Sequence, residues 1–567
     1  METAQTSAHP PHIADRIRLI DHTVDILLKC QVRDTGSRWH GGFLDPLRLV
    51  AEPWYAAGGV DVLVAAWVEP ASRHFGSRRV LQAAHAAMSY VIRRQYPNGT
   101  IDAYFVGDMQ AAPNVAFVSR MLCRAERKLA RVNHEPQAAE LREQIRLFLA
   151  RAGKAMIERR AYTSNHRWVI ADALLQVNQL LPDPKLVERA MRYLDEGIDI
   201  NEDGMYSERS TSYGMLTNET LISIGELTGD SRYHEYVARN LEFVTYLVQP
   251  NGEDAYQFST RQDAVIPRIL VRGEDVFRYM AAKTNNGLFA SMADHLTPSS
   301  AEIDALIARE KEAWSQPVAD DAVSFPSLKY SWLSALTERG KLLGPWAYSP
   351  IDHIPRLPLR TEYQKVFAAS RLARHRSGSV AATVMAMQPN FFSLHAGDVV
   401  LEGLRIRYLY HNWKSFVPLV FRCDEGVYVL SGRFLGTTEG PKFPEEDQDL
   451  FITVTMKPEG MKWSFGVAVD GQPMVPVQVE FAVRPAGRIR RGGSSEEVAS
   501  LRNPFVSGDF ELVGEKGRLR FRGVPERAHR QVDHTGHWMG NIPIVSLYVT
   551  AFSPCELSFE IEGESGD

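Results

Sequence analysis

The hydrophobic pattern of the chain changes its period near the middle. Up to about residue 337, apolar side chains recur every three or four positions, and beyond about residue 360 they alternate with polar side chains. The first spacing is typical of amphipathic helices, and the second is typical of strands with one solvated face. The pattern therefore predicts an α-helical N-terminal part and a β-strand C-terminal part.

The N-terminal part is predicted to be a series of helices joined mostly by short loops. One apolar stripe consists of Ile170, Leu174, Val177 and Leu181, and Pro182 ends it. Such a stripe must face another element, so consecutive helices are expected to pack as hairpins. Further helices are predicted at 13–31, 57–69, 79–95, 111–132, 136–157, 267–296 and 302–314. The sequence shows no fixed-period repeat, which favours closure into an (α/α) toroid over an open superhelix.

The C-terminal part is predicted to be a set of antiparallel strands. Leu404, Ile406 and Tyr408 alternate with arginines, and similar alternation recurs at 475–483, 518–522, 545–549 and 557–562. A hairpin turn is expected at Asp470-Gly471, because this dipeptide favours two-residue turns. Many antiparallel strands with one wet face predict a β-sandwich.

Proline residues mark the boundary between the two patterns. The segment 338–362 contains Pro345, Pro350, Pro355 and Pro358. Because proline stiffens a connection, this segment is predicted to be a stiff linker. The predicted division is an (α/α) toroid at 1–337, a Pro-rich linker at 338–362 and an antiparallel β-sandwich at 363–567.

Composition is that of an ordinary soluble protein and argues against several classes of partner. Of the 567 residues, 44% are hydrophobic and 23% are charged, and the formal net charge is −5. This balance gives no support for nucleic-acid binding. No apolar run reaches the roughly 18 residues that span a bilayer, and the N-terminus lacks a secretory pattern. We therefore expect a cytoplasmic protein that does not enter membranes. The sequence does not decide whether the protein forms a homo-oligomer.

Three polar clusters interrupt the helical part, each at a junction between predicted helices. Their sequences are TSNHRW at 163–168, NEDGMYSERSTSYG at 201–214 and NGEDAYQFSTRQD at 251–263. Loops at one end of a toroid converge on the mouth of its cleft, where ligands bind. We therefore expect the three clusters to contribute to one site.

The side chains of these clusters suit β-elimination on a uronic acid. Asn165 and His166 lie at a predicted helix N-terminus, where free N–H groups and the dipole favour an anion. Amide, imidazole or guanidinium donors can neutralise the substrate carboxylate, so that the proton on the adjacent carbon becomes removable. An imidazole, or a phenol such as that of Tyr213, can then transfer protons. The other candidates for substrate binding are Trp168, Tyr206, Glu208, Arg209 and Arg261.

The motifs SNHRWVIADALLQ, DGMYSERSTSYG and QPNGEDAYQFSTRQD together resemble the heparinase II/III-like group of polysaccharide lyases. The resemblance implies a toroid followed by an antiparallel β-sandwich, with an anionic, uronate-containing oligosaccharide as substrate. It implies that Asn165 neutralises the substrate carboxylate and that His166 acts as base or orients that carboxylate. Tyr213 would be the general acid and is also a candidate base. Exolytic cleavage is expected.

The resembling lyases also use a histidine from the sandwich, in a histidine-rich strand motif. His395, in NFFSLHAGDVVLEGLRI, is the nearest counterpart here and the expected third catalytic residue. His375 and His411 compete with it for this role.

Metal binding is not expected. The four cysteines are scattered without metal-ligand spacing, which predicts reduced thiols. The remaining dense group is His529, His534 and His537 with Asp533, and its spacing matches no zinc motif. The sequence therefore predicts neither a metal nor a cofactor.

Two other functions stay open. A glycoside hydrolase on the same toroid would need two carboxylates facing one glycosidic bond. The candidates for that pair are Asp108, Asp203, Glu208, Glu253 and Asp254. A non-catalytic carbohydrate-binding protein would keep the fold without the chemistry. In that case Asn165 would be a helix cap and Tyr213 a core aromatic.

Overall fold

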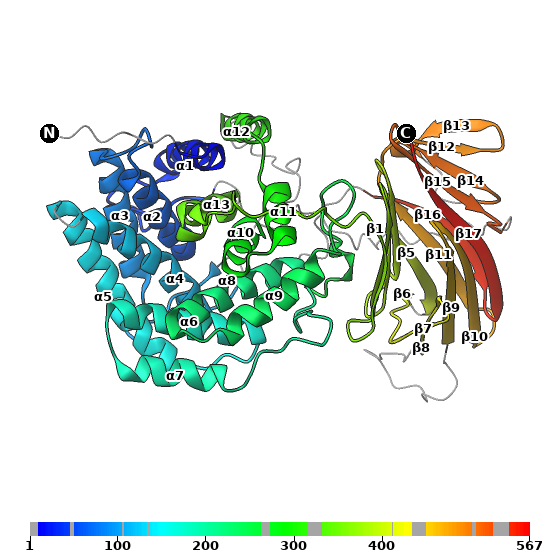
Figure 1. Ribbon diagram of the computed structural model, residues 1–567, viewed down its shortest axis with the longest axis horizontal. Coiled ribbons are helices and arrows are strands. Elements are labelled where there is room, and N and C mark those ends of the chain that lie inside the picture. Colours follow the sequence, from blue (N-terminus) through cyan, green and yellow to red (C-terminus); the bar gives the residue numbers. More distant parts are fainter. Residues whose placement is uncertain are drawn as a thin grey trace. The chain divides into compact units, whose positions relative to one another are not determined.

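The structure, a computed structural model, describes residues 9–45, 50–104, 107–132, 135–261, 273–315, 332–410, 412–433, 450–501, 506–525 and 544–566. Helices come first and antiparallel strands follow, which confirms the predicted fold class (Figure 1). Contacts divide the chain into two units. The helical unit comprises Met1–Asp199, Met215–Ala238 and Arg272–Leu357, and the sandwich unit comprises Ile200–Gly214, Arg239–Val271 and Pro358–Asp567.

Thirteen α-helices lie within the described residues. They are α1 (Pro11–Cys30), α2 (Pro53–Val68), α3 (Arg78–Arg94), α4 (Ala112–Leu129), α5 (Pro136–Glu158), α6 (Ser164–Leu180), α7 (Pro184–Leu194), α8 (Thr211–Thr228), α9 (Arg232–Val244), α10 (Gly273–Thr284), α11 (Gly287–Leu296), α12 (Ser300–Ser315) and α13 (Trp332–Thr337). Proline at the first helical position starts α1, α2, α5 and α7, where its missing N–H costs nothing.

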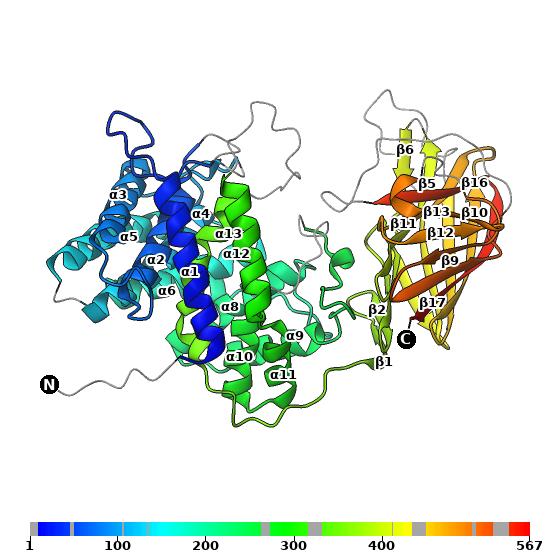
Figure 2. The ribbon, with the colours of Figure 1, turned by 90° about the horizontal axis from the view of Figure 1, so that it is seen from above.

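The helical unit has the two-layered arrangement of an (α/α) toroid. Helices α2, α4 and α6 contact one another in succession, and α3, α5 and α7 pack against them. All but two residues of α2 are buried, as expected of an inner helix. The outer helix α7 buries only one stripe, which is typical of a helix with a solvated face. Helix α1 lies beside α12 (Figure 2).

The helix expected at 267–296 is two helices, and residues 267–272 lie outside the described range. The break falls at Asn285, whose φ of 51° is left-handed and ends α10. The side chain of Asn286 then caps α11 by accepting hydrogen bonds from the N–H groups of Leu288 (2.9 Å) and Phe289 (3.1 Å). Apolar periodicity continues through the pair of asparagines, so the pattern alone did not locate the break.

Most of the segment expected to be a linker is packed into the helical unit, which extends to Leu357. Arg339 is buried and forms an ion pair with Glu310 at 2.6 Å. Lys128 on α4 donates to the carbonyl of Gly340 at 2.6 Å. The chain enters the first strand at Glu362, shortly after the last residue of the helical unit.

The sandwich unit contains two antiparallel sheets. The eight-stranded sheet has the order β1-β2-β3-β4-β5-β11-β16, with β6 also paired to β5. Its strands are β1 (Glu362–Phe367), β2 (Leu372–Ser377), β3 (Val380–Met385), β4 (Phe392–Ala396), β5 (Val399–Tyr410), β6 (Asn412–Ser415), β11 (Pro476–Val483) and β16 (Val545–Phe552). The nine-stranded sheet has the order β13-β12-β14-β15-β17-β10-β9-β8-β7. Its strands are β7 (Val420–Asp424), β8 (Val427–Arg433), β9 (Leu450–Glu459), β10 (Lys462–Gly471), β12 (Arg488–Arg491), β13 (Ser494–Glu497), β14 (Phe510–Val513), β15 (Gly517–Arg522) and β17 (Cys555–Ser565).

The predicted alternation matches the core between the sheets. Leu404 and Ile406 on β5 lie opposite Phe481 and Val479 on β11, and all four belong to one apolar cluster. The prediction of a hairpin turn at Asp470-Gly471 is wrong. Strand β10 pairs with β9 and β17, whereas β11 pairs with β5 and β16, so this connection passes from one sheet to the other.

Two segments that precede the strands in sequence, 200–214 and 239–271, belong to the sandwich unit. They contain two of the three polar clusters. The expected division at 337 and 363 did not anticipate this, because it followed the change of hydrophobic period alone.

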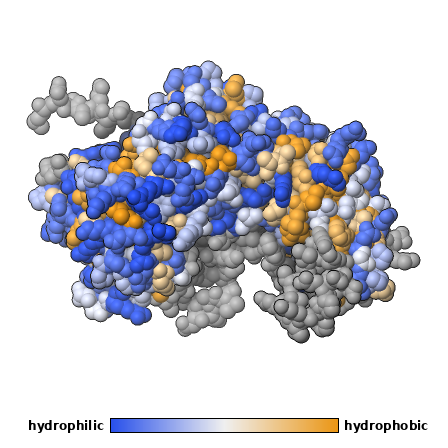
Figure 3. Space-filling model, turned by 90° about the horizontal axis from the view of Figure 1, so that it is seen from below, coloured by the Kyte–Doolittle hydropathy of each residue, from blue (hydrophilic) through white to orange (hydrophobic). Residues whose placement is uncertain are grey.

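Hydrophobic residues on the face shown in Figure 3 form several separate areas among hydrophilic ones. Tyr162 and Met474 are among the most exposed apolar side chains, at 85% and 72%. Within the described part of the chain, no helix combines the length and apolarity needed to cross a membrane.

Candidate functional site

The first polar cluster starts α6 in the helical unit. Asn165 is the second residue of this helix, and its side chain is buried with 1% exposure. Neither its amide nitrogen nor its carbonyl oxygen has a hydrogen-bond partner among the described residues. Leaving a buried polar group unpaired costs about 1–3 kcal/mol. Such an unpaired amide at a helix N-terminus is the feature expected of a group that binds a polar ligand.

His166, the next residue, borders a short row of aromatic rings. Its ring stands edge-on to that of Phe117 on α4, with centroids 6.3 Å apart. The ring of Phe117 lies 4.8 Å from that of Trp54 on α2. All three side chains are half-buried, so each keeps some surface exposed. A partly exposed aromatic row beside a polar helix end suits contact with sugar rings.

Arg167 and Trp168 have structural partners within the helical unit. Arg167 pairs with Asp199 at 2.8 Å and with Glu196. The indole of Trp168 has no exposed surface, and its N–H points to the carbonyl of Gly197 at 3.4 Å. A fully buried ring presents no face to a sugar, so the structure places Trp168 in helix packing and not on a stacking surface.

The second and third polar clusters meet around Tyr213 in the sandwich unit. The guanidinium carbon of Arg261 lies 4.5 Å from the centroid of the Tyr213 ring. Arg261 is held from its other side by Glu208, with 3.3 Å between Nη1 and Oε2. Glu208 is nearly buried, whereas Arg261 keeps 29% of its side chain exposed. Three of the predicted site residues are thus brought together as a phenol, a cation over its face, and a carboxylate that orients the cation.

The backbone that carries Tyr213 is capped. Tyr213 is the third residue of α8, and its N–H donates to the hydroxyl of Ser210 at 3.0 Å. This is the usual N-cap arrangement, in which a serine satisfies an otherwise free N–H of the first turn. The hydroxyl of Thr211, the first helical residue, donates to the carboxylate of Asp254. Local hydrogen bonds therefore define the start of the helix that presents the phenol.

Arg209 binds backbone carbonyls in this structure, and Tyr206 is buried. Arg209 donates to the carbonyls of Ser370 (2.8 Å) and Ala386 (3.3 Å). Burial, together with the charge of Arg371, lowers the pKa of Arg209 to about 10. Tyr206 is 2% exposed, and burial raises the pKa of its phenol. Direct substrate contact, which was expected of both side chains, is therefore not favoured.

The sandwich unit also contains a buried charge network. Glu402 on β5 is fully buried and accepts from Tyr256 and Gln257, both at 2.8 Å. Arg484 binds Glu402 and also holds Glu253 through two bonds of 2.9 and 2.6 Å. Sequence reasoning missed Glu402 and Arg484. A charged residue inside the apolar run VVLEGL was the available signal for Glu402.

His395 lies on β4 with 1% exposure. Neither ring nitrogen has a hydrogen-bond partner among the described residues. Burial and the charges of Arg484 and Arg374 hold its pKa well below the usual value, so the ring is neutral. A ring without exposed surface does not meet a substrate directly, and the expected catalytic role of His395 is not favoured by this placement.

The competing histidines differ in what the structure says of them. His375 is hydrogen-bonded to the hydroxyl of Tyr428 at 2.7 Å and packs on Trp463, so it belongs to the core. His411 lies outside the described residues, as does the histidine group near 529–537. Within the described part of the chain, no group of three or more His, Cys, Asp or Glu side chains is arranged to hold a metal ion.

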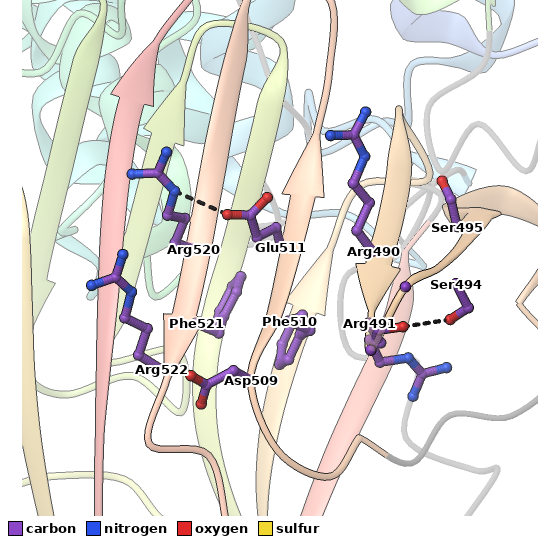
Figure 4. Close-up of a pocket in the computed structure, with 12 residues that line it drawn as sticks. Arg490, Arg491, Ser494, Ser495, Asp509, Phe510, Glu511, Arg520, Phe521 and Arg522 are labelled. Atoms are coloured by element: carbon purple, nitrogen blue, oxygen red, sulfur yellow. Dashed lines mark hydrogen bonds and ion pairs between the residues drawn. The ribbon is translucent and has the colours of Figure 1, made fainter.

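A pocket of about 460 Å³ lies on strands β12 to β15 and is rich in arginine (Figure 4). Arg520 pairs with Glu511 at 3.0 Å and with Glu562 at 3.6 Å. Arg490 lies opposite Glu511 in the strand register. The row thus alternates cation and anion across neighbouring strands, which stabilises the sheet. The pocket lining as a whole contains four arginines, Arg490, Arg491, Arg520 and Arg522, against the carboxylates of Asp509 and Glu511.

Comparisons with known proteins bear on the fold. No protein-family model matches the sequence, and a search of curated proteins found no match. Among solved structures, heparinase III is 10% identical with a TM-score of 0.58, and the match covers 100% of this chain and 86% of that one. A chondroitin AC lyase of Streptomyces coelicolor A3, solved with chondroitin sulphate, is 13% identical with a TM-score of 0.55, covering 99% and 80%.

A xanthan lyase of Paenibacillus is 9% identical with a TM-score of 0.57. That match covers 98% of this chain and 58% of the xanthan lyase, so this chain spans less than two thirds of that enzyme. Identities this low establish similarity of fold and leave the substrate undetermined. The chain has the (α/α) toroid and antiparallel β-sandwich fold of the heparinase II/III-like polysaccharide lyases.

Proposed function

We propose that this protein is a lyase that cleaves a uronate-containing oligosaccharide by β-elimination. The observation that carries the proposal is the stack of Arg261 on Tyr213, with Glu208 orienting the arginine. A guanidinium held over the face of the phenol fixes the position of the ring and places a positive charge next to it. The fold, shared with polysaccharide lyases, supports the same reaction class.

The substrate carboxylate is assigned to the start of α6. The side-chain amide of Asn165, which has no partner among the described residues, offers a donor to an anion at the start of α6, and the helix dipole adds to its effect. As the proton leaves the carbon beside the carboxylate, negative charge moves onto the carboxylate oxygens. Donors already in place stabilise that charge without reorganising. His166 either orients the carboxylate or acts as the base.

Tyr213 is assigned the proton transfers at the leaving oxygen. The C–H bond beside the carboxylate breaks, its electron pair forms the new C=C bond, and the C–O bond to the leaving sugar breaks. The phenol donates its proton to that oxygen. If Tyr213 is also the base, it enters as phenolate, takes the carbon-bound proton and passes it to the leaving oxygen. No proton is gained or lost overall.

Hydrolysis by paired carboxylates is less well supported. Four of the five acidic candidates already hold structural partners, in the pairs Glu208–Arg261, Glu253–Arg484, Asp203–Ser370 and Asp254–Thr211. Burial raises the pKa of the fifth, Asp108, which would suit a general acid. A hydrolase would still need a second carboxylate facing the same bond.

The test is an activity screen on defined uronate oligosaccharides, following the ultraviolet absorbance of the 4,5-unsaturated product. The lyase proposal expects this absorbance to rise, and Tyr213→Phe to abolish the rise with folding intact. Tyr363→Phe is the control, because it loses a structural hydrogen bond (2.8 Å to the carbonyl of Tyr246) in the same unit. Reducing ends without absorbance would indicate a hydrolase. Binding without either product would indicate a non-catalytic protein.

A further inference from the structure

The turn between β1 and β2 is bound by the segment that leads to Tyr213. Ser370 in this turn is fully buried. Its N–H donates to Asp203 at 2.7 Å, its hydroxyl accepts from Asn201 at 3.0 Å, and its carbonyl accepts from Arg209 at 2.8 Å. All three polar groups of one turn residue are therefore used by the single segment 200–214.

Arg209 adopts an unusual backbone conformation. Its φ is 46°, in the left-handed region that residues other than glycine enter only at an energetic cost. Such conformations persist where surrounding contacts over-determine them, and they cluster at functional sites. Here the side chain supplies those contacts, because it reaches the carbonyls of both Ser370 and Ala386. Among the described residues it forms no ion pair with a carboxylate.

The backbone of Arg209 is connected both to the start of the helix that carries Tyr213 and to the residue before Arg261. Ser210, the next residue, caps the helix at Tyr213. The carbonyl of Arg209 accepts a hydrogen bond of 3.1 Å from the N–H of Thr260, and Thr260 is the residue that precedes Arg261. A shift of the Arg209 peptide would therefore move the phenol and the cation that covers it.

We infer that Arg209 is a positioning residue, which fixes the start of α8 on the β1–β2 turn so that Tyr213 and Arg261 stay in register. We call this set of hydrogen bonds from Arg209 to the β1–β2 turn the clamp. The clamp itself is structural, whereas its effect on turnover rests on the proposed function of Tyr213. It differs from the role expected of Arg209 from sequence, because the guanidinium acts on backbone carbonyls and not on substrate.

The inference is tested with Arg209→Met, which keeps the length of the side chain and removes both hydrogen bonds. Backbone hydrogen exchange within 203–214 of the intact protein should become roughly 10- to 100-fold faster. This is the factor by which local opening increases when hydrogen bonds to a charged group are lost. Strands of the sandwich should exchange as before. Asp203→Asn, which weakens a different bond to Ser370, should loosen the same peptide.

Kinetics on a cleaved uronate should show a fall in kcat of about 10- to 100-fold, as a small misplacement of a catalytic group produces, with KM nearly unchanged. Arg209→Lys should recover part of the loss. The matched control is Arg376→Met. Arg376 on β2 also donates to two backbone carbonyls, those of Gly378 (3.1 Å) and Val248 (3.2 Å), and neither belongs to segment 200–214, so kcat and the exchange of 203–214 should stay within twofold.

Unchanged exchange in 203–214 for Arg209→Met would overturn the clamp. A raised, salt-dependent KM with unchanged kcat would overturn it in favour of substrate binding. If wild-type protein cleaves no uronate while exchange responds as expected, the clamp stands and the proposed function of Tyr213 fails.

Discussion

Replacing Asn165 by leucine should make the helical unit more stable and abolish elimination. The side chain is 1% exposed, and its two polar atoms are unpaired among the described residues. Each such atom costs about 1–3 kcal/mol. Leucine puts two methyl groups in nearly the same place, and its helix propensity is better by a few tenths of a kcal/mol. Allowing for partial hydration of the amide, we expect the free energy of unfolding to rise by about 1–3 kcal/mol.

The assay is differential scanning calorimetry combined with hydrogen exchange of α6, because a chain of two units need not unfold in one step. The transition of the helical unit should rise by about 2–5 °C. Asn178→Leu on the same helix is the control. The Asn178 carbonyl oxygen accepts from the N–H of Asp183 at 3.0 Å, so its loss should destabilise. If Asn165→Leu lowers stability by more than about 1 kcal/mol, the amide has a partner and the reasoning fails.

Three further predictions concern stability. Burial lowers the pKa of His375 to about 4, so the unfolded chain takes up a proton first as pH falls. The neutral ring therefore contributes about 3 kcal/mol to the free energy of unfolding above pH 6.5, and this contribution is lost as the pH falls towards 4. In His375→Gln, the free energy of unfolding measured with urea should depend less steeply on pH across this range. Glu402→Ala should cost the sandwich unit about 3–5 kcal/mol by calorimetry, because the buried side-chain donors of Tyr256 and Gln257 lose their acceptor and Arg484 loses one of its two carboxylates. The exposed Glu459→Ala should cost less than about 1 kcal/mol. Asn286→Ala should cost about 1 kcal/mol through the lost helix cap, read from faster exchange of α11.

The fold class was predictable because side-chain periodicity is a local property. Leu404, Ile406 and Tyr408 alternate whatever strand they pair with, and the Ile170 stripe follows from helix geometry alone. The errors occurred where local patterns permit more than one outcome. Asp470-Gly471 has the composition of a hairpin turn, but the choice of partner strand depends on packing of both sheets. Asn285-Asn286 interrupts a helix that apolar spacing alone would continue.

The candidate site was predictable only in its residue types. Polar clusters at helix junctions pointed to Asn165, His166, Tyr213, Glu208 and Arg261, since such side chains gather where loops are functional. The contacts among these side chains depend on the tertiary structure. The stack of Arg261 on Tyr213 joins residues 48 positions apart in sequence.

The sequence by itself determined the order of helices and strands and the chemical inventory of the loops, because both follow from short-range spacing. Tertiary structure decided which side chains are free to act. It buried Trp168 and His395, used Arg209 on backbone carbonyls, and left the amide of Asn165 without a partner among the described residues. The reason is physical: burial and hydrogen-bond partners come from residues distant in the chain, so no local pattern carries them.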